Sequence, residues 1–295
     1  MSNELRPSLA ELAPPTVNGD SKANLAAILA SPSYQLAEYD INFIKRDEIR
    51  PVRMHLELLK TETLLRDHAI KSTVVVFGSA RIPPREVAEA ELRAAQDAAK
   101  QSPASALLKR AVSRAESILA KSRYYEEARR FGQIVSKACQ IDKRCDFVVT
   151  TGGGPGIMEA VNRGAFDIGC KSIGLNIDLP HEQEPNAYIT PDLCFQFHYF
   201  AIRKFHFILR AKALVVFPGG YGTLDELFDT LCLRQTKRMQ AIPIILYGRE
   251  YWDSILDFHK MTDEGVVADE DLDLISYAET PEEAWQIIAD FHHIK

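Results

Sequence analysis

The chain has 295 residues, of which 46% are hydrophobic and 26% charged, so a mainly disordered protein is excluded. This length is enough for one large α/β domain or two smaller ones. No stretch approaches the roughly eighteen apolar residues of a membrane span, and the first residues lack the apolar core of a secretory signal. The sequence therefore predicts a cytoplasmic protein with no membrane partner.

The formal net charge is −6, from 35 basic and 41 acidic side chains, which disfavours nucleic acid as a partner. A small anionic ligand stays open, because arginines and backbone N–H groups can bind phosphate even in an acidic protein. The cysteines are scattered singly with no C-x-x-C pair, so neither a disulfide framework nor a metal site is expected. The five cysteines are Cys139, Cys145, Cys170, Cys194 and Cys232.

Residues 1–22 are rich in Pro, Ser and Asn, which predicts a disordered leader. Residues 23–70 place apolar side chains at helical spacing, which predicts a helical extension that packs against the core or a second subunit. Nothing in this extension suggests chemistry. Residues 71–295 form the main domain, with an insertion at about 84–121 whose Ala, Glu, Lys and Arg content predicts long exposed helices.

The main domain alternates short apolar strands with helices, which is typical of an α/β fold with a doubly wound, mostly parallel, Rossmann-like sheet. The first strand, at residues 73–77, is apolar on both faces, as expected for a strand that is buried on both sides. Further strands are expected at residues 146–150, 171–176, 194–197, 213–217 and 243–247, with helices between them and at about 250–262 and 281–292.

Glycine-bearing turns follow three of these strands, at residues 78–81, 152–156 and 218–222. Open parallel sheets bind ligands beyond the carboxyl ends of their strands, where helix N-termini present free N–H groups. One such turn is explained by the need for a tight bend, whereas three at one edge favour a phosphate-sized anion. The glycines match neither the G-x-G-x-x-G fingerprint nor a P-loop, so a nucleoside monophosphate or sugar phosphate fits better than NAD or ATP.

Glu226 follows Thr223 by three positions, which is the spacing of a capping box in which both side chains bond the start of a helix. In a second interpretation, the Thr223 hydroxyl donates to a phosphate oxygen while the Glu226 carboxylate faces a ribose or an attacking water. A carboxylate in that position suits chemistry at an anomeric carbon, because it stabilises an oxocarbenium-like centre and orients water.

The helix that precedes the third glycine turn carries Arg203, Lys204 and Arg210. A solvated basic stripe is the default explanation for all three, although Arg203 or Lys204 can also reach the pocket. His198 and His206 have no partner visible in the sequence, so a core or surface role is favoured over catalysis.

Four segments together resemble the Lonely Guy family: residues 151–165, 172–177, 203–204 and 218–226. The motif at 218–226, with an upstream Arg-Lys pair, is specific to that family and its relatives. Members include cytokinin riboside 5'-monophosphate phosphoribohydrolases, and many carry the older label "possible lysine decarboxylase". The resemblance covers about residues 72–262, and the helices outside it look like those of the longer bacterial forms.

The resemblance implies that residues 71–295 form a nucleotide-binding catalytic domain with Glu226 and Arg203 as catalytic residues. The implied reaction is hydrolysis of the N-glycosidic bond of a nucleoside 5'-monophosphate, of the AMP or cytokinin ribotide type, to free base and ribose 5-phosphate. No metal or organic cofactor is implied, and the implied assembly is a homodimer or larger homo-oligomer. Substrate and phosphate binding fall to Ser79, Arg81, Gly153, Gly154, Met158, Lys204, Gly219, Gly220, Gly222 and Thr223.

Two departures from the shorter members leave the base unassigned. The methionine that often precedes the Arg-Lys pair and the tryptophan that follows the glutamate are both missing. A protein that binds a nucleotide or a phosphorylated cofactor without hydrolysing it stays open as an alternative. Lysine decarboxylation is disfavoured, because it usually needs pyridoxal phosphate on a lysine, and no lysine here has a context that marks it for that role.

Overall fold

The computed structural model describes residues 20–140, 145–179 and 184–294. Residues 1–19, which make up most of the predicted leader, lie outside this description. Within the described part, no helix combines the length and the apolar character needed to cross a membrane.

The chain divides into two compact units, Met1–His55 and Leu56–Lys295. The first unit contains α1 (Ser21–Ala30) and α2 (Ile41–Ile44), neither of which buries a residue. Helix α3 (Arg50–Asp67) belongs to both units and buries Thr61 and Leu65 in its second half. The segment predicted to be a helical extension is therefore helical.

The second unit is built on one seven-stranded sheet with the order β4-β3-β2-β1-β5-β6-β7. Every neighbouring pair of strands is parallel, which confirms the predicted α/β fold with a doubly wound, parallel sheet. The strands are β1 (Thr73–Phe77), β2 (Val148–Thr151), β3 (Ile173–Ile177), β4 (Cys194–Phe197), β5 (Ala211–Val216), β6 (Ile244–Tyr247) and β7 (Ile275–Ala278).

Helices cover both faces of the sheet, because the central strands are apolar on both faces. In β1, Val74 and Val76 pack with α6, α7 and α12, whereas Val75 and Phe77 pack with α3, α8, α9 and α10. All the residues of β1 are buried, as its continuous apolar run predicts. These helices are α6 (Arg123–Cys139), α7 (Ile157–Asp167), α8 (Phe200–Leu209), α9 (Tyr221–Gln235), α10 (Arg249–Ile255) and α12 (Pro281–His292), and α11 (Phe258–Asp263) follows α10.

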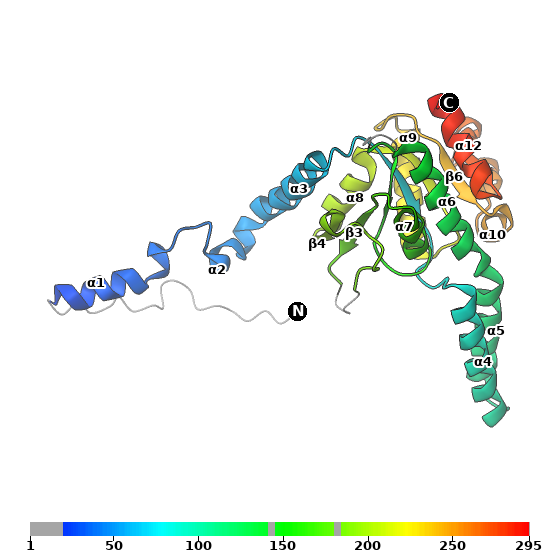
Figure 1. Ribbon diagram of the computed structural model, residues 1–295, viewed down its shortest axis with the longest axis horizontal. Helices are drawn as coiled ribbons and strands as arrows, with labels where there is room; N and C mark the ends of the chain where they lie inside the picture. The colour runs from blue at the N-terminus through cyan, green and yellow to red at the C-terminus, as the bar shows by residue number, and fades with distance from the viewer. Residues whose placement is uncertain (1–19, 141–144, 180–183, 295) are drawn as a thin grey trace. The chain divides into compact units, whose positions relative to one another are not determined.

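The predicted insertion at 84–121 forms a pair of helices, α4 (Arg85–Gln101) and α5 (Ala106–Lys121). The two helices pack against each other and extend beyond the sheet (Figure 1). Ala88 is the one residue that the two helices bury, which agrees with their high content of charged residues.

Three of the differences between the observed and the predicted elements concern β2, β5 and β7. Strand β7 was not predicted, because it has only four residues and is only partly apolar. Strand β2 begins at Val148 because Phe147 has a positive φ of 49°, which interrupts the extended backbone. Strand β5 begins at Ala211, directly after Arg210, whose carbonyl already accepts the N–H of Thr73 at 2.9 Å.

The strand order reverses between β1 and β5, which are neighbours in the sheet although β2, β3 and β4 lie between them in the chain. In open α/β sheets the ligand crevice lies at this switch point, beyond the carboxyl ends of the two strands. The turns at Gly78 and Pro218 meet there, since the N–H of Ser79 donates to the carbonyl of Pro218 at 2.9 Å.

Candidate active site

A cavity of about 680 Å³ opens at the switch point. The turn after β1, the first turn of α8 and the turn between β5 and α9 supply its walls. Most of the predicted site residues line it together, although their sequence positions span almost 150 residues. They are Ser79, Arg81, Met158, Arg203, Gly219, Gly220, Gly222, Thr223 and Glu226.

Helix α9 begins at Tyr221 with Gly220 as its N-cap, and no side chain caps it. The predicted capping role of Thr223 and Glu226 is therefore wrong. The reason is that the chain turns at the preceding glycines, which starts the helix two residues before Thr223. Because the first N–H groups of a helix have no intrahelical partner, this end of α9 presents backbone donors at the cavity.

Two contacts of Gly219 fix the turn before α9. A Cβ on Gly219 would lie 2.6 Å from the Cβ of Thr223, so the close packing of these two residues requires glycine. The Tyr251 hydroxyl in α10 donates to the carbonyl of Gly219 at 2.6 Å. A Cβ on Gly220 or Gly222 would meet no atom within 4 Å, so the backbone there faces open space.

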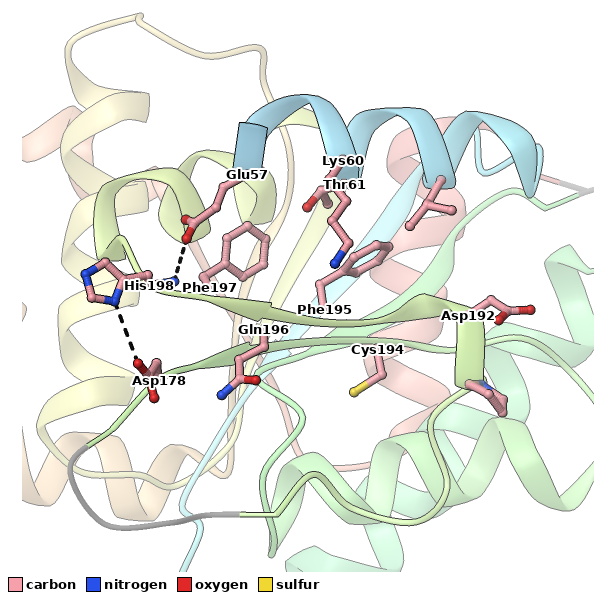
Figure 2. A pocket seen from close by; sticks show the side chains of 12 residues that line it. Glu57, Lys60, Thr61, Asp178, Asp192, Cys194, Phe195, Gln196, Phe197 and His198 are labelled. Carbon is pink, nitrogen blue, oxygen red and sulfur yellow. Dashed lines mark hydrogen bonds and ion pairs between the residues drawn. The ribbon is translucent and has the colours of Figure 1, made fainter. Parts of the chain in front are cut away.

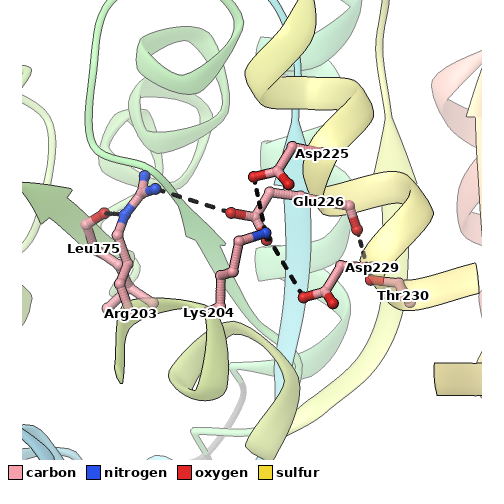
Figure 3. A network of polar contacts seen from close by, with 7 residues as sticks. All are labelled: Leu175, Arg203, Lys204, Asp225, Glu226, Asp229 and Thr230. Carbon is pink, nitrogen blue, oxygen red and sulfur yellow. Dashed lines mark hydrogen bonds and ion pairs between the residues drawn. The ribbon is translucent and has the colours of Figure 1, made fainter. Parts of the chain in front are cut away.

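Glu226 lies one turn into α9 with its side chain only 7% exposed. Its carboxylate is 3.3 Å from the Lys204 ammonium and 4.0 Å from the Arg203 guanidinium (Figure 3). Burial raises the pKa of this carboxyl, and the two cations only partly oppose that effect. The carboxylate thus faces cations beside the cavity rather than the backbone of its own helix.

The Arg203 side chain is largely buried, and several neighbours fix its position. Its Nε donates to the carbonyl of Leu175 at 2.7 Å, and its guanidinium lies 4.9 Å from the centre of the Phe207 ring. A Cβ on Gly152 would lie 2.7 Å from Nη2 of Arg203, so the first glycine of that turn makes room for the guanidinium. Burial lowers the pKa of Arg203, while Glu226 favours its charged form.

Lys204 does not line the cavity among the described residues, although it was predicted to bind substrate. Its ammonium instead contacts three carboxylates, those of Asp225 at 2.9 Å, Glu226 at 3.3 Å and Asp229 at 3.7 Å. Burial alone would lower the pKa of Lys204, but these carboxylates raise it overall. Lys204 therefore neutralises the acidic start of α9 (Figure 3).

Ser79 and Arg81 line the cavity from the turn after β1. The Ser79 hydroxyl accepts the N–H of Arg81 at 3.0 Å, and the Ser79 carbonyl accepts the N–H of Ile157 at 3.1 Å. These bonds connect the turn after β1 to the start of α7, next to Met158. The Arg81 side chain is exposed and lies at the rim.

Gly153 and Gly154 lie outside the cavity wall, so their placement does not support the predicted phosphate role. The N–H of Gly153 already donates to the Thr151 hydroxyl at 3.0 Å. Gly153 has a φ of 74°, and a Cβ there would clash with the Asn176 side chain. The carbonyl of Gly154 accepts the amide of Asn186 at 3.1 Å, so this turn serves the packing of the loop after β3.

The sequence analysis missed the side chains of Phe200, Tyr221, Tyr251 and Ile255, which line the same cavity. Phe200 and Tyr221 are largely exposed at its mouth and offer flat apolar surface. Two features of the sequence could have indicated these residues. Tyr221 lies within the glycine motif, and Tyr251 lies shortly after the carboxyl end of β6.

Residues 158–288 match the family described as "Possible lysine decarboxylase". The comparison with curated proteins finds no match. Among solved structures, a molybdenum cofactor binding protein from the phototrophic bacterium Rippkaea orientalis is 19% identical, with a TM-score of 0.41, over 57% of this chain and 87% of that one. The Moco carrier protein from Chlamydomonas reinhardtii is 18% identical, with a TM-score of 0.41, over 58% and 88%.

An X-ray structure of a structural genomics consortium target is 21% identical, with a TM-score of 0.46, over 74% of this chain and 99% of that one. These three structures are too distant to indicate a ligand. The family match covers Arg203 and Glu226, which line the cavity, and Lys204, whose ammonium contacts Glu226. Over residues 158–288, the chain is similar to the possible lysine decarboxylase family, which includes the Lonely Guy proteins.

Proposed function

We propose that the protein hydrolyses the N-glycosidic bond of a nucleoside 5'-monophosphate, of the AMP or cytokinin ribotide type, to free base and ribose 5-phosphate. The observation that carries this proposal is the placement of Glu226. Its carboxylate is buried beside a cavity at the switch point and is held by Arg203 and Lys204 rather than by backbone N–H groups. The reaction needs no metal or organic cofactor.

The phosphate is proposed to bind at the start of α9, beside Gly219, Gly220 and Gly222. Free N–H groups and the positive end of the helix dipole favour an anion at this position. The turn at Ser79 and the rim residue Arg81 close the same side of the cavity. The ribose then lies toward Glu226, because that carboxylate repels the phosphate and favours a developing positive charge.

In the proposed reaction, the bond between C1' of the ribose and the base nitrogen breaks, and its electron pair leaves with the base. Water adds to C1', and the Glu226 carboxylate accepts one proton from this water. The leaving base takes one proton from solvent and Glu226 returns its proton to solvent, so the net reaction consumes one water. A carboxyl whose pKa is raised by burial is a stronger base than an exposed one, which suits this role.

Arg203 is proposed to hold Glu226 in position and to balance the charge of the bound ligand. Its guanidinium stays charged near neutral pH, although burial lowers its pKa below the ordinary value of an arginine. The aromatic surfaces of Phe200 and Tyr221 at the mouth are suited to stack with a base.

Lysine decarboxylation, which the family's description names, finds no support at Lys204. A Schiff-base lysine needs a neutral amine, and neighbours that lower its pKa provide one. Lys204 has the opposite setting, since the carboxylates of Asp225, Glu226 and Asp229 raise its pKa.

The experiment is a substrate panel of AMP, CMP, GMP and a cytokinin ribotide, analysed for free base and ribose 5-phosphate. We expect equal amounts of both products from at least one monophosphate, and far slower release from the matching nucleoside, which lacks the phosphate. The absence of base from every substrate, with the fold verified by circular dichroism, contradicts the proposal. Co-purification of an intact nucleotide favours the alternative of binding without hydrolysis. The proposed homodimer is tested separately by light scattering.

A further inference from the structure

Helix α3 contacts α8, the helix that carries Arg203 and Lys204, and the residues at the N-terminal boundary of α8. Two carboxylates of α3, those of Glu57 and Glu62, reach opposite ends of α8. Both belong to a segment whose sequence suggests no chemistry and which lies outside the part that matches the family.

Glu57 binds the backbone just before the N-terminal end of α8. One carboxylate oxygen accepts the N–H of His198 at 2.8 Å (Figure 2). The other accepts the N–H of Tyr199 at 3.3 Å. Tyr199 is the N-cap of α8, and its own side chain makes no capping bond. A negative charge at this end also interacts favourably with the helix dipole.

Glu62 holds the C-terminal end of α8. Its two oxygens bind two nitrogens of the Arg210 guanidinium, and the Nη2–Oε2 distance is 2.8 Å. Glu62 also lies 3.3 Å from Nδ1 of His206, whose side chain is fully buried. Glu62 and Arg210 are 23% and 19% exposed, so solvent screens this two-point contact less than an open surface pair. The default expectation of a solvated Arg210 is therefore wrong.

The position of α8 decides whether Arg203 and Lys204 face Glu226. Both cations lie on the early turns of α8, close to the end that Glu57 caps. Their partner, Glu226, lies on a different helix, so the distances of 4.0 Å and 3.3 Å depend on how α8 is placed. A displacement of about 1 Å at a reacting group can cost about a hundredfold in rate.

We propose that Glu57 and Glu62 are positioning residues that hold the two ends of α8 and thereby place Arg203 and Lys204 opposite Glu226. This inference rests on the proposed function for its kinetic consequence. The groups proposed to bind phosphate lie on α9 and on the turn after β1, which these two carboxylates do not contact in the described structure.

The kinetic experiment compares Glu57→Gln and Glu62→Gln with the full-length wild type. Each substitution is expected to lower kcat by about 10- to 100-fold while KM changes by less than about threefold, because the groups proposed to bind the phosphate lie on α9 and on the turn after β1 rather than on α8. Asp67→Asn is the matched control: it removes an exposed carboxylate from the end of the same helix and is expected to leave kcat unchanged. An unchanged kcat in both glutamine variants, or an equal loss in the control, overturns the inference.

Hydrogen exchange read by mass spectrometry tests the same inference without any activity. In Glu57→Gln, peptides covering residues 198–204 are expected to exchange at least about tenfold faster, while peptides at the start of α9 keep their protection. Unchanged exchange at 198–204 overturns the inference even if the protein proves inactive. An inactive wild type combined with faster exchange in the variant refutes the proposed function alone. Glu57→Gln keeps the test decisive if Glu62→Gln fails to fold.

Discussion

Replacing Glu226 by glutamine removes one negative charge from the cavity with little change in side-chain volume. The amide oxygen can still accept a hydrogen bond from Lys204, so α8 and α9 are expected to keep their arrangement. The substitution therefore isolates the carboxylate's charge and its ability to accept a proton from the packing of the site.

The expected loss of rate follows from the burial of Glu226. A charge that develops about 4 Å from the carboxylate gains about 4 kcal/mol at an effective dielectric constant of about 20, and about 1 kcal/mol in water. Because Glu226 is only 7% exposed, the larger value applies. At about 1.4 kcal/mol for each tenfold change, Glu226→Gln lowers kcat about a thousandfold.

Asp225→Asn is the matched control, because Asp225 is the adjacent residue and also contacts Lys204. Its side chain is 58% exposed, so the smaller value applies, and kcat is expected to fall about fivefold. Single-turnover base release measures both variants, and titration calorimetry with the monophosphate measures binding. Binding is expected to persist in Glu226→Gln, since backbone N–H groups hold the phosphate. Equal losses of kcat in the two variants, or a loss of binding that matches the loss of turnover, refute this reasoning.

Three further predictions concern the rest of the site. Gly152→Ala places a Cβ 2.7 Å from the Arg203 guanidinium and 2.9 Å from the Met158 sulfur, so kcat is expected to fall about 10- to 100-fold. Because both contacts are with the ends of flexible side chains, the free energy of unfolding measured in urea is expected to fall by less than about 1 kcal/mol. Tyr251→Phe removes the bond to the carbonyl of Gly219, which is expected to cost about 1 kcal/mol and to raise the Kd for the monophosphate about fivefold in calorimetry, whereas an unchanged Kd contradicts a role for this bond. Because the pKa of Glu226 is raised in the folded protein, its contribution to stability is present below the ordinary pKa of 4.5 and is lost as the pH rises through the higher folded value. Glu226→Gln is therefore expected to have a higher Tm than wild type at pH 7, and the difference in Tm is expected to shrink toward pH 4.5. A lower Tm of the variant at pH 7 contradicts this prediction.

The sequence was sufficient to predict all of the sheet except β7, and most of the cavity wall. Apolar runs such as Thr73–Phe77 indicate strands buried on both faces, and the glycine turns that follow them mark the carboxyl edge. Once β1 and β5 are neighbours, Ser79 and Gly219 must lie close together, as their turns do. The pattern did not reveal the N-cap of α9, because the two glycines allow the chain to turn before Thr223, the residue that resembled a cap.

The sequence could not reveal the contacts of α3. Glu57 and its partner His198 are separated by 141 positions, and Glu62 and Arg210 by 148. Neither carboxylate stands in a motif, so each looks like an ordinary solvated residue of an amphipathic helix. The roles of Gly153 and Gly154 were also hidden, because a glycine needed for a positive φ and a glycine needed by a ligand look alike in a sequence.

The central claim is that water attacks the anomeric carbon of a nucleoside monophosphate beside Glu226. The most direct measurement is the reaction of the wild-type protein with its best monophosphate in water enriched in heavy oxygen, followed by mass spectrometry of all products. The account predicts one heavy oxygen in ribose 5-phosphate, an unlabelled free base in equal amount, and no labelled inorganic phosphate. Heavy oxygen in inorganic phosphate together with an intact nucleoside, or no product from any monophosphate, would contradict it.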